Sequence, residues 1–232
     1  MNGKGMESAL ARRLFLTRLG AGVGVVGASV VSSSSAVAQV APDATWRPAR
    51  HPQDDWYDKV PGIHHFVFDS TTADGMALAL RFADNYFTAN HDGYGLNDSD
   101  LAVVIVARHK STPFAYNDAM WAKYGKQLSE HAEFTDPKTK TPPTVNLYAA
   151  ADDGTGQAGR LNGLIKKGVQ FAVCQMSTHG ISGKIAQATG AKADAVFKEI
   201  SANLVGNSHL VAAGILAVNR AQERGYSFVV AI

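Results

Sequence analysis

The chain contains a single cysteine, Cys174, at a position where a thiol can do chemistry. The residues before it, 169–174, form a short apolar run rich in β-formers, which predicts a buried strand. Cys174 then falls at the carboxyl end of that strand, the edge where ligands and reactive groups gather in α/β sheets. A thiolate there is nucleophilic if a helix N-terminus or a cation stabilises it. The other interpretation, a small apolar side chain in the core, stays open.

Histidines are the predicted partners of this thiol. His179 follows Cys174 by five residues and is the candidate base or cation, although a position on a surface loop is the alternative. The next element is expected to open at residues 180–182, with backbone N–H groups and Lys184 near the thiol. His109 follows another predicted strand, so it joins the site if it reaches the same edge of the sheet.

The sequence predicts neither a metal site nor a nucleotide cofactor. One cysteine excludes an intramolecular disulfide, CxxC redox chemistry and a multi-cysteine zinc site, and no pair of ligands shows a metal-binding spacing. His64 and His65 open the first predicted strand, so we expect them at the edge opposite Cys174. Residues 154–159 fit G-x-G-x-x-G, but two aspartates precede them and no ribose-binding acid follows the next strand. We interpret that stretch as a flexible loop.

The N-terminus has the three-part plan of a signal peptide. Arg12 and Arg13 form a twin-arginine pair, a weakly apolar glycine-rich run follows, and residues 36–38 read Ala-Val-Ala. The apolar run is too short for a good membrane anchor, so we expect no stable membrane insertion. The prediction is twin-arginine (Tat) export, cleavage after Ala38 and a periplasmic location; an uncleaved anchor or an amphipathic helix is the alternative.

Composition describes a globular chain without a bias towards nucleic acid. Of its 232 residues, 18% are charged and 46% hydrophobic. Residues 1–38 hold four basic side chains and one acidic one, which leaves 18 basic and 19 acidic side chains in the remainder. The expected mature chain is therefore near neutral, and no nucleic-acid partner is predicted.

The order of elements predicts an α/β domain over residues 62–232, preceded by an irregular arm with several prolines and two tryptophans over 39–61. Apolar runs that alternate with helical patterns favour a three-layer sandwich with a mainly parallel five-stranded sheet. The helix that starts at Asp74 is expected to be followed by a turn-rich loop over 91–98. The predicted strands are 63–69, 101–107, 169–174, 209–213 and 226–232, and the predicted helices include 117–127, 161–167, 193–205 and 215–224.

Three segments carry a family resemblance: the early strand–helix unit, residues 164–174 and residues 208–228. Together they resemble the DsrE/DsrF-like superfamily, which includes the Tus sulfur-relay subunits and YchN-like proteins. The resemblance implies a flavodoxin-like α/β domain that forms homo- or hetero-oligomers. It also implies that the position matching the family's sulfur-carrying cysteine is Cys174, which would hold sulfane sulfur as a persulfide.

Three functions follow as hypotheses. The first is a periplasmic sulfur carrier that exchanges sulfane sulfur at Cys174 with a donor or acceptor protein. The second is a non-catalytic homo-oligomeric module that binds a small ligand or partner and has a structural cysteine. The third, suggested by Tat export, is an accessory protein linked to electron transfer or to a metal.

Overall fold

The computed structural model describes residues 46–150 and 159–232. The predicted signal segment, the beginning of the arm and residues 154–158 of the glycine-rich motif lie outside the described residues. Among the residues that are described, no helix is both long enough and apolar enough to cross a membrane.

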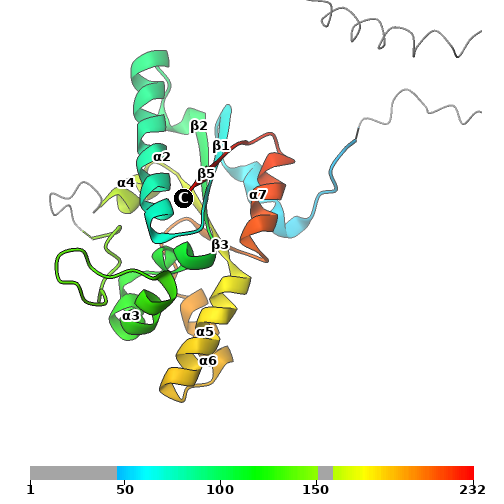
Figure 1. The fold of residues 1–232 in the computed structure, drawn as a ribbon. Helices are drawn as coiled ribbons and strands as arrows, with labels where there is room; N and C mark the ends of the chain where they lie inside the picture. Colours follow the sequence, from blue (N-terminus) through cyan, green and yellow to red (C-terminus); the bar gives the residue numbers. More distant parts are fainter. Residues whose placement is uncertain (1–45, 151–158) are drawn as a thin grey trace, which may run out of the picture. The chain divides into compact units, whose positions relative to one another are not determined.

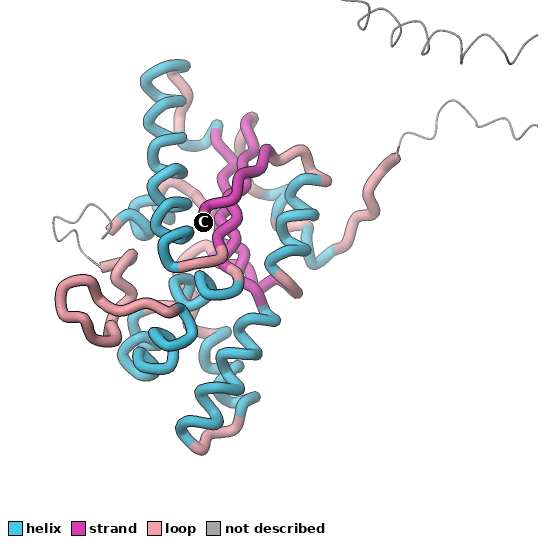
Figure 2. The backbone as a smooth tube through the Cα atoms, in the orientation of Figure 1, coloured by secondary structure: helices cyan, strands magenta, loops and turns pink. Residues whose placement is uncertain are grey.

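Five strands form one sheet in the order β4-β3-β2-β1-β5, and all neighbouring pairs are parallel (Figures 1 and 2). The second strand along the chain is buried over its whole length because both faces of the sheet are covered there, which explains why all its residues are apolar. The strands are β1 (His64–Ser70), β2 (Leu101–Ala107), β3 (Gln170–Cys174), β4 (Ser208–Val211) and β5 (Ser227–Ala231).

Helices cover both faces, and the handedness of the connections explains which helix lies where. The chain moves from β1 through β4 in one direction across the sheet, so right-handed crossovers place the connecting helices on one face. The step from β4 back to β5 reverses direction and places α7 on the other face (Figure 1). The helices are α2 (Ala73–Tyr94), α3 (Asp118–Ala132), α4 (Arg160–Lys166), α5 (Gln175–Thr189), α6 (Ala193–Ser201) and α7 (Gly214–Gln222).

The prediction of an α/β fold with a five-stranded parallel sheet is confirmed. The strand order differs in one respect from the flavodoxin order 2-1-3-4-5. The strand that flanks β1 on its outer side is the last along the sequence instead of the second. The connection that leads to it carries α7, so a single helix covers most of the second face.

Local sequence accounts for α2. Thr72 caps the helix by accepting a hydrogen bond from the Gly75 N–H at 2.8 Å. Met76, Leu80 and Phe87 then lie on its buried face, as the helical spacing predicts. The predicted loop over 91–98 is wrong in its first part, because the helix runs on through Tyr94.

The start of α5 also differs from the prediction. The helix begins at Gln175, directly after the strand, whereas the sequence placed the opening of the next element at residues 180–182. Gly180 and Gly183 lie within the helix on exposed positions, where glycine weakens a helix without breaking it. Cys174 is therefore both the last residue of β3 and the N-cap of α5.

The described part of the arm carries two short 3-10 helices, η1 (Pro52–Asp54) and η2 (Tyr57–Lys59). The buried Tyr57 hydroxyl donates to the carbonyl of Ala217 in α7 at 2.8 Å. Trp56 stacks on His209 of β4, with ring centroids 4.0 Å apart. These contacts place Trp56 and Tyr57 against the α7 face of the sheet.

We expect acid to destabilise this packing. Burial lowers the pKa of His209 below its ordinary value of 6.5, so the unfolded chain binds a proton that the folded chain resists. The free energy of unfolding should therefore fall as the pH drops below about 6.5. Urea denaturation of the wild type and of His209→Gln between about pH 7 and pH 5 measures this, and the variant should show the smaller decrease. If the free energy of unfolding fell equally with pH in both proteins, His209 would not be the group that causes the decrease.

Candidate functional site

Cys174 stands at the junction of β3 and α5. As the N-cap of the helix, its Sγ accepts a hydrogen bond from the Ser177 N–H at 3.4 Å. This arrangement aims the positive end of the helix dipole at the sulfur. The residue is only 7% exposed.

The fold creates a crevice beside this cysteine. In the register of the sheet Cys174 pairs with Val211, the last residue of β4. From Cys174 the chain continues into α5 on one face of the sheet, whereas from Val211 it continues to α7 on the other face. Adjacent strands whose connections leave to opposite faces open a crevice at their carboxyl ends, which is where open α/β sheets bind ligands.

A pocket of about 350 Å³ occupies this crevice. Its lining comes from the carboxyl end of β3, from the segments that follow β2, β3 and β4, and from the last turn of α3. Two exposed apolar residues, Met176 and Ile215, are part of the lining, at 69% and 62% exposure. The lining residues are Arg108, His109, His131, Cys174, Met176, Ser177, Gly180, Lys184, Ala213, Gly214 and Ile215.

Arg108 is held in this lining by a buried carboxylate. Its Nε and Nη2 donate to the two oxygens of Asp69, each at 2.7 Å, in a bidentate pair. The Asp69 side chain is 2% exposed and that of Arg108 is 27% exposed. The hydrogen bonds to Asp69 raise the pKa of Arg108, and the nearby Cys174 raises it further. The guanidinium is therefore a fixed positive charge beside the thiol.

The segment after β2 is fastened to the end of β1. The buried Ser111 hydroxyl accepts from the Arg108 N–H at 3.0 Å and donates to the carbonyl of Ser70 at 2.7 Å. Gly214 meets the same segment from the other side. A Cβ on this glycine would lie 2.4 Å from the Cβ of Arg108, so the close approach requires glycine there.

His109 opens the 3-10 helix η4 (His109–Ala115) with a left-handed backbone, φ 57°. Its carbonyl accepts two hydrogen bonds, one from the Ser177 hydroxyl and one from Nε2 of His131, both at 3.1 Å. One carbonyl thus ties the first turn of α5 to the last turn of α3. Histidine is among the residues that tolerate this backbone region better than most.

His131 contributes an imidazole whose second nitrogen is unused. Because Nε2 donates to the carbonyl of His109, the ring carries its proton there, and the buried Nδ1 has no hydrogen-bond partner among the described residues. Burial lowers the pKa of His131 and outweighs the hydrogen bond to the His109 carbonyl, which raises it, and the charges of Lys184 and Lys110 lower it further. The ring is therefore a neutral base at pH 7.

A chain of hydroxyl groups fixes the backbone under the thiol. The Tyr116 hydroxyl donates to Thr178 Oγ1 at 2.9 Å, and Thr178 Oγ1 donates to the carbonyl of Cys174 at 3.0 Å. Both side chains are fully buried. Burial raises the pKa of Tyr116, so the phenol stays protonated and acts as a donor.

The structure brings only some of the predicted site residues together. His109 and Lys184 line the pocket with Cys174. His179 does not line it; its ring stacks on Phe197 of α6, with centroids 3.7 Å apart. On a helix that starts at Gln175, residues 176, 180 and 184 share the face towards the pocket, and position 179 is turned away from it. His64 and His65 begin β1, at the opposite edge of the sheet as expected.

Three pocket groups escaped the sequence analysis: Arg108, its partner Asp69, and His131. A signal was present for the first two. Asp69 ends the predicted first strand and Arg108 directly follows the predicted second strand, so both fall at the carboxyl edge. No sequence signal relates His131 to Cys174, because α3 reaches the site only through its packing.

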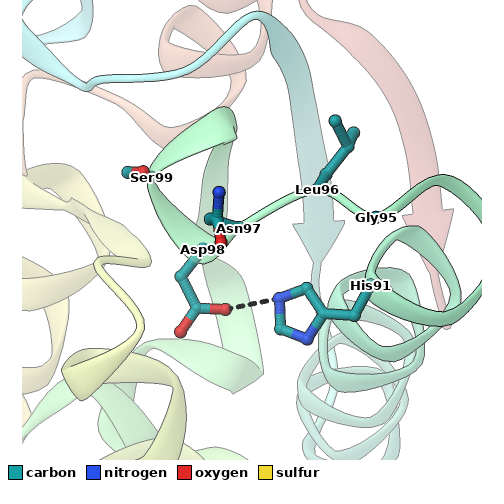
Figure 3. Close-up of a pocket in the computed structure, with 6 residues that line it drawn as sticks. All are labelled: His91, Gly95, Leu96, Asn97, Asp98 and Ser99. Carbon is teal, nitrogen blue, oxygen red and sulfur yellow. Dashed lines mark ion pairs between the residues drawn. The ribbon is translucent and has the colours of Figure 1, made fainter.

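A second depression, of about 630 Å³, lies near the other end of the strands (Figure 3). Figure 3 shows His91 from α2 pointing at Asp98, and the two form an ion pair at 2.9 Å. The described lining of this depression contains one hydroxyl group, that of Ser99, and no thiol. Across the described part of the chain, no group of three or more His, Cys, Asp or Glu side chains is placed to hold a metal ion.

Comparison with protein-family models, with curated proteins and with solved structures finds no match for this chain. The geometry of the Cys174 pocket is therefore the basis on which a function is assigned.

Proposed function

We propose that this protein is a thiol-based sulfur carrier of the DsrE-like type, in which Cys174 accepts sulfane sulfur as a persulfide and passes it on. The observation that carries the proposal is the position of the cysteine, the N-cap of α5 in a pocket at the crevice between β3 and β4. The strand-end cysteine and the five-stranded parallel sheet agree with the family resemblance of the sequence.

Two features of the pocket support a reactive thiol over an inert one. The N-terminus of α5 and Arg108 both stabilise negative charge, as a thiolate or a persulfide requires. The low exposure of Cys174 supports a carrier as well, since a terminal persulfide sulfur is lost to other thiols where it is freely accessible.

Sulfur loading tests the proposal. Incubation of the mature protein with hydrogen polysulfide should add about 32 Da, one sulfur atom, to the intact mass. Because Cys174 is the only cysteine, Cys174→Ser should abolish the adduct, whereas Lys198→Gln, at an exposed position of α6 outside the pocket, should retain it. A wild-type protein that takes up no sulfur, or a Cys174→Ser variant that takes up as much as the wild type, would refute the carrier function.

The edge strand β5 supports the second candidate, a homo-oligomeric binding module. It pairs only with β1, and Phe228 and Val230 on its α7 side are 39% and 42% exposed. An unpaired edge with exposed apolar side chains favours association with a second copy. Sedimentation velocity tests the association, and a protein that sediments as a monomer at micromolar concentration would rule out the homo-oligomer.

The reactivity of Cys174 distinguishes the two candidates. A thiol that reacts only after unfolding would favour the binding module over the carrier.

The proposed location is the periplasm after Tat export, which the pair Arg12–Arg13 and the sequence around Ala38 support. Donor and acceptor would then be exported proteins or small sulfur compounds of that compartment.

A further inference from the structure

The Cys174 pocket carries an excess of basic groups. Four of its lining side chains are basic, and none of the described residues that line it is acidic. The four come from three separate segments, so their convergence is a product of the fold. They are Arg108 and His109 at the start of η4, His131 in α3 and Lys184 in α5.

The nearby carboxylates leave part of this charge unpaired. Asp69 binds Nε and Nη2 of Arg108, and no hydrogen bond among the described residues involves Nη1. Glu133 forms an ion pair with Lys110, which does not line the pocket. Lys184 has no ion-pair partner in the described part of the chain. A pocket of this kind attracts an anion and holds it by charge-assisted hydrogen bonds.

The volume of the Cys174 pocket and the residues that line it limit the identity of the anion. A volume of about 350 Å³ lies at the small end of ligand pockets and admits a compact molecule. Met176, Ala213 and Ile215 add apolar surface to the same lining. A small oxyanion with a soft or apolar end fits a pocket that offers both kinds of group.

We infer that the sulfur donor is a small thiosulfonate anion, inorganic thiosulfate or an organic thiosulfonate, whose oxyanion end binds Arg108 and Lys184. This inference rests on the proposed carrier function. With the oxygens held by the basic groups, the outer sulfane sulfur is left for Cys174. The thiol sulfur attacks this sulfur and forms a new S–S bond as the old S–S bond breaks. For thiosulfate, the sulfite leaving group keeps the electron pair and takes the thiol proton, so Cys–SH and S₂O₃²⁻ give Cys–S–S⁻ and HSO₃⁻ without an external oxidant.

Paired alkylation reagents test the anion site independently of sulfur transfer. Iodoacetate and iodoacetamide are nearly equal in size and differ in charge, so the ratio of their rates at Cys174 reports the local potential. The native protein should favour iodoacetate about fivefold more than the urea-unfolded protein does, an effect on the order of one unit charge near the sulfur. Lys184→Gln should lower the ratio. Lys198→Gln, which removes an exposed lysine of α6 outside the pocket, should not.

The rates of sulfur loading from different donors distinguish the thiosulfonate inference from the carrier function itself. Thiosulfate and methanethiosulfonate should each load wild-type Cys174. Lys184→Gln should lose about fivefold in rate with both, whereas Lys198→Gln should keep the wild-type rate. Loading by only one of the two thiosulfonates identifies which member of the class is the donor. Loading by polysulfide alone, or a native rate ratio equal to the unfolded one, would overturn the inference and leave the carrier function standing. Loading by no donor would refute both.

Discussion

Asp69→Ala is expected to lower the free energy of unfolding by about 2–3 kcal/mol. The mutation removes a carboxylate whose side chain is 2% exposed and leaves the Arg108 guanidinium, mostly buried, without its counter-charge. The full cost of an uncompensated buried charge is larger, but the Arg108 side chain is 27% exposed and can reach water. Urea denaturation followed by circular dichroism measures the change.

Two further variants test whether the loss of stability comes from breaking the buried Asp69–Arg108 pair. Asp69→Asn keeps an oxygen acceptor for the guanidinium, and we expect it to lose about half as much as Asp69→Ala. Asp84→Asn removes a carboxylate that is 39% exposed and pairs with Lys167, so its cost should stay below about 1 kcal/mol. Similar losses for Asp69→Ala and Asp84→Asn would show that the Asp69–Arg108 pair behaves as a surface ion pair.

Trp121→Ala is expected to cost about 4 kcal/mol. Trp121 is fully buried in α3, its ring centroid is 5.5 Å from that of Phe114, and its Nε1–H donates to the carbonyl of Pro113 at 3.1 Å. The mutation leaves a cavity and removes one of the two hydrogen bonds that the Pro113 carbonyl accepts, the other coming from the Tyr116 N–H. Because the indole binds η4, which begins with His109, the loss should also loosen the pocket and speed the alkylation of Cys174.

Thermal and urea unfolding measure the stability part of this prediction. Trp121→Phe keeps most of the packing and loses the hydrogen bond, so it should fall between the wild type and Trp121→Ala. Tyr94→Ala removes an aromatic side chain that is 79% exposed and should change stability by less than about 0.5 kcal/mol. An unchanged alkylation rate in a folded Trp121→Ala protein would show that η4 keeps its place without the indole.

The fold could be predicted largely from hydrophobic patterns. The continuous apolar run over 101–107 became β2 with the same bounds, and the helical spacing of Met76, Leu80 and Phe87 identified the buried face of α2. The predicted ends of helices are wrong where the prediction treats a glycine as the end of a helix or as the start of the next element. Gly93 and Gly180 lie inside helices, because the packing of a whole helix outweighs the cost of about 1 kcal/mol for one glycine.

The site could be predicted only in part. The carboxyl-edge rule identified Cys174 and allowed for His109, both of which line the pocket. His179 was chosen for its nearness in sequence, but a helix that starts directly after the strand turns that position towards α6. The bidentate pair between Asp69 and Arg108 joins the ends of two neighbouring strands, so it depends on the order of strands, which local patterns do not encode.

The strand order also has a consequence for biosynthesis. The outer edge of β1 stays open until β5, the last strand along the sequence, has left the ribosome, and α7 leaves only shortly before it. A nascent chain that ends after β4 thus exposes one apolar face of its sheet and a free backbone edge. The sheet closes only after β5 has been translated, and the proposed Tat route, which accepts folded cargo, would have to wait for that event.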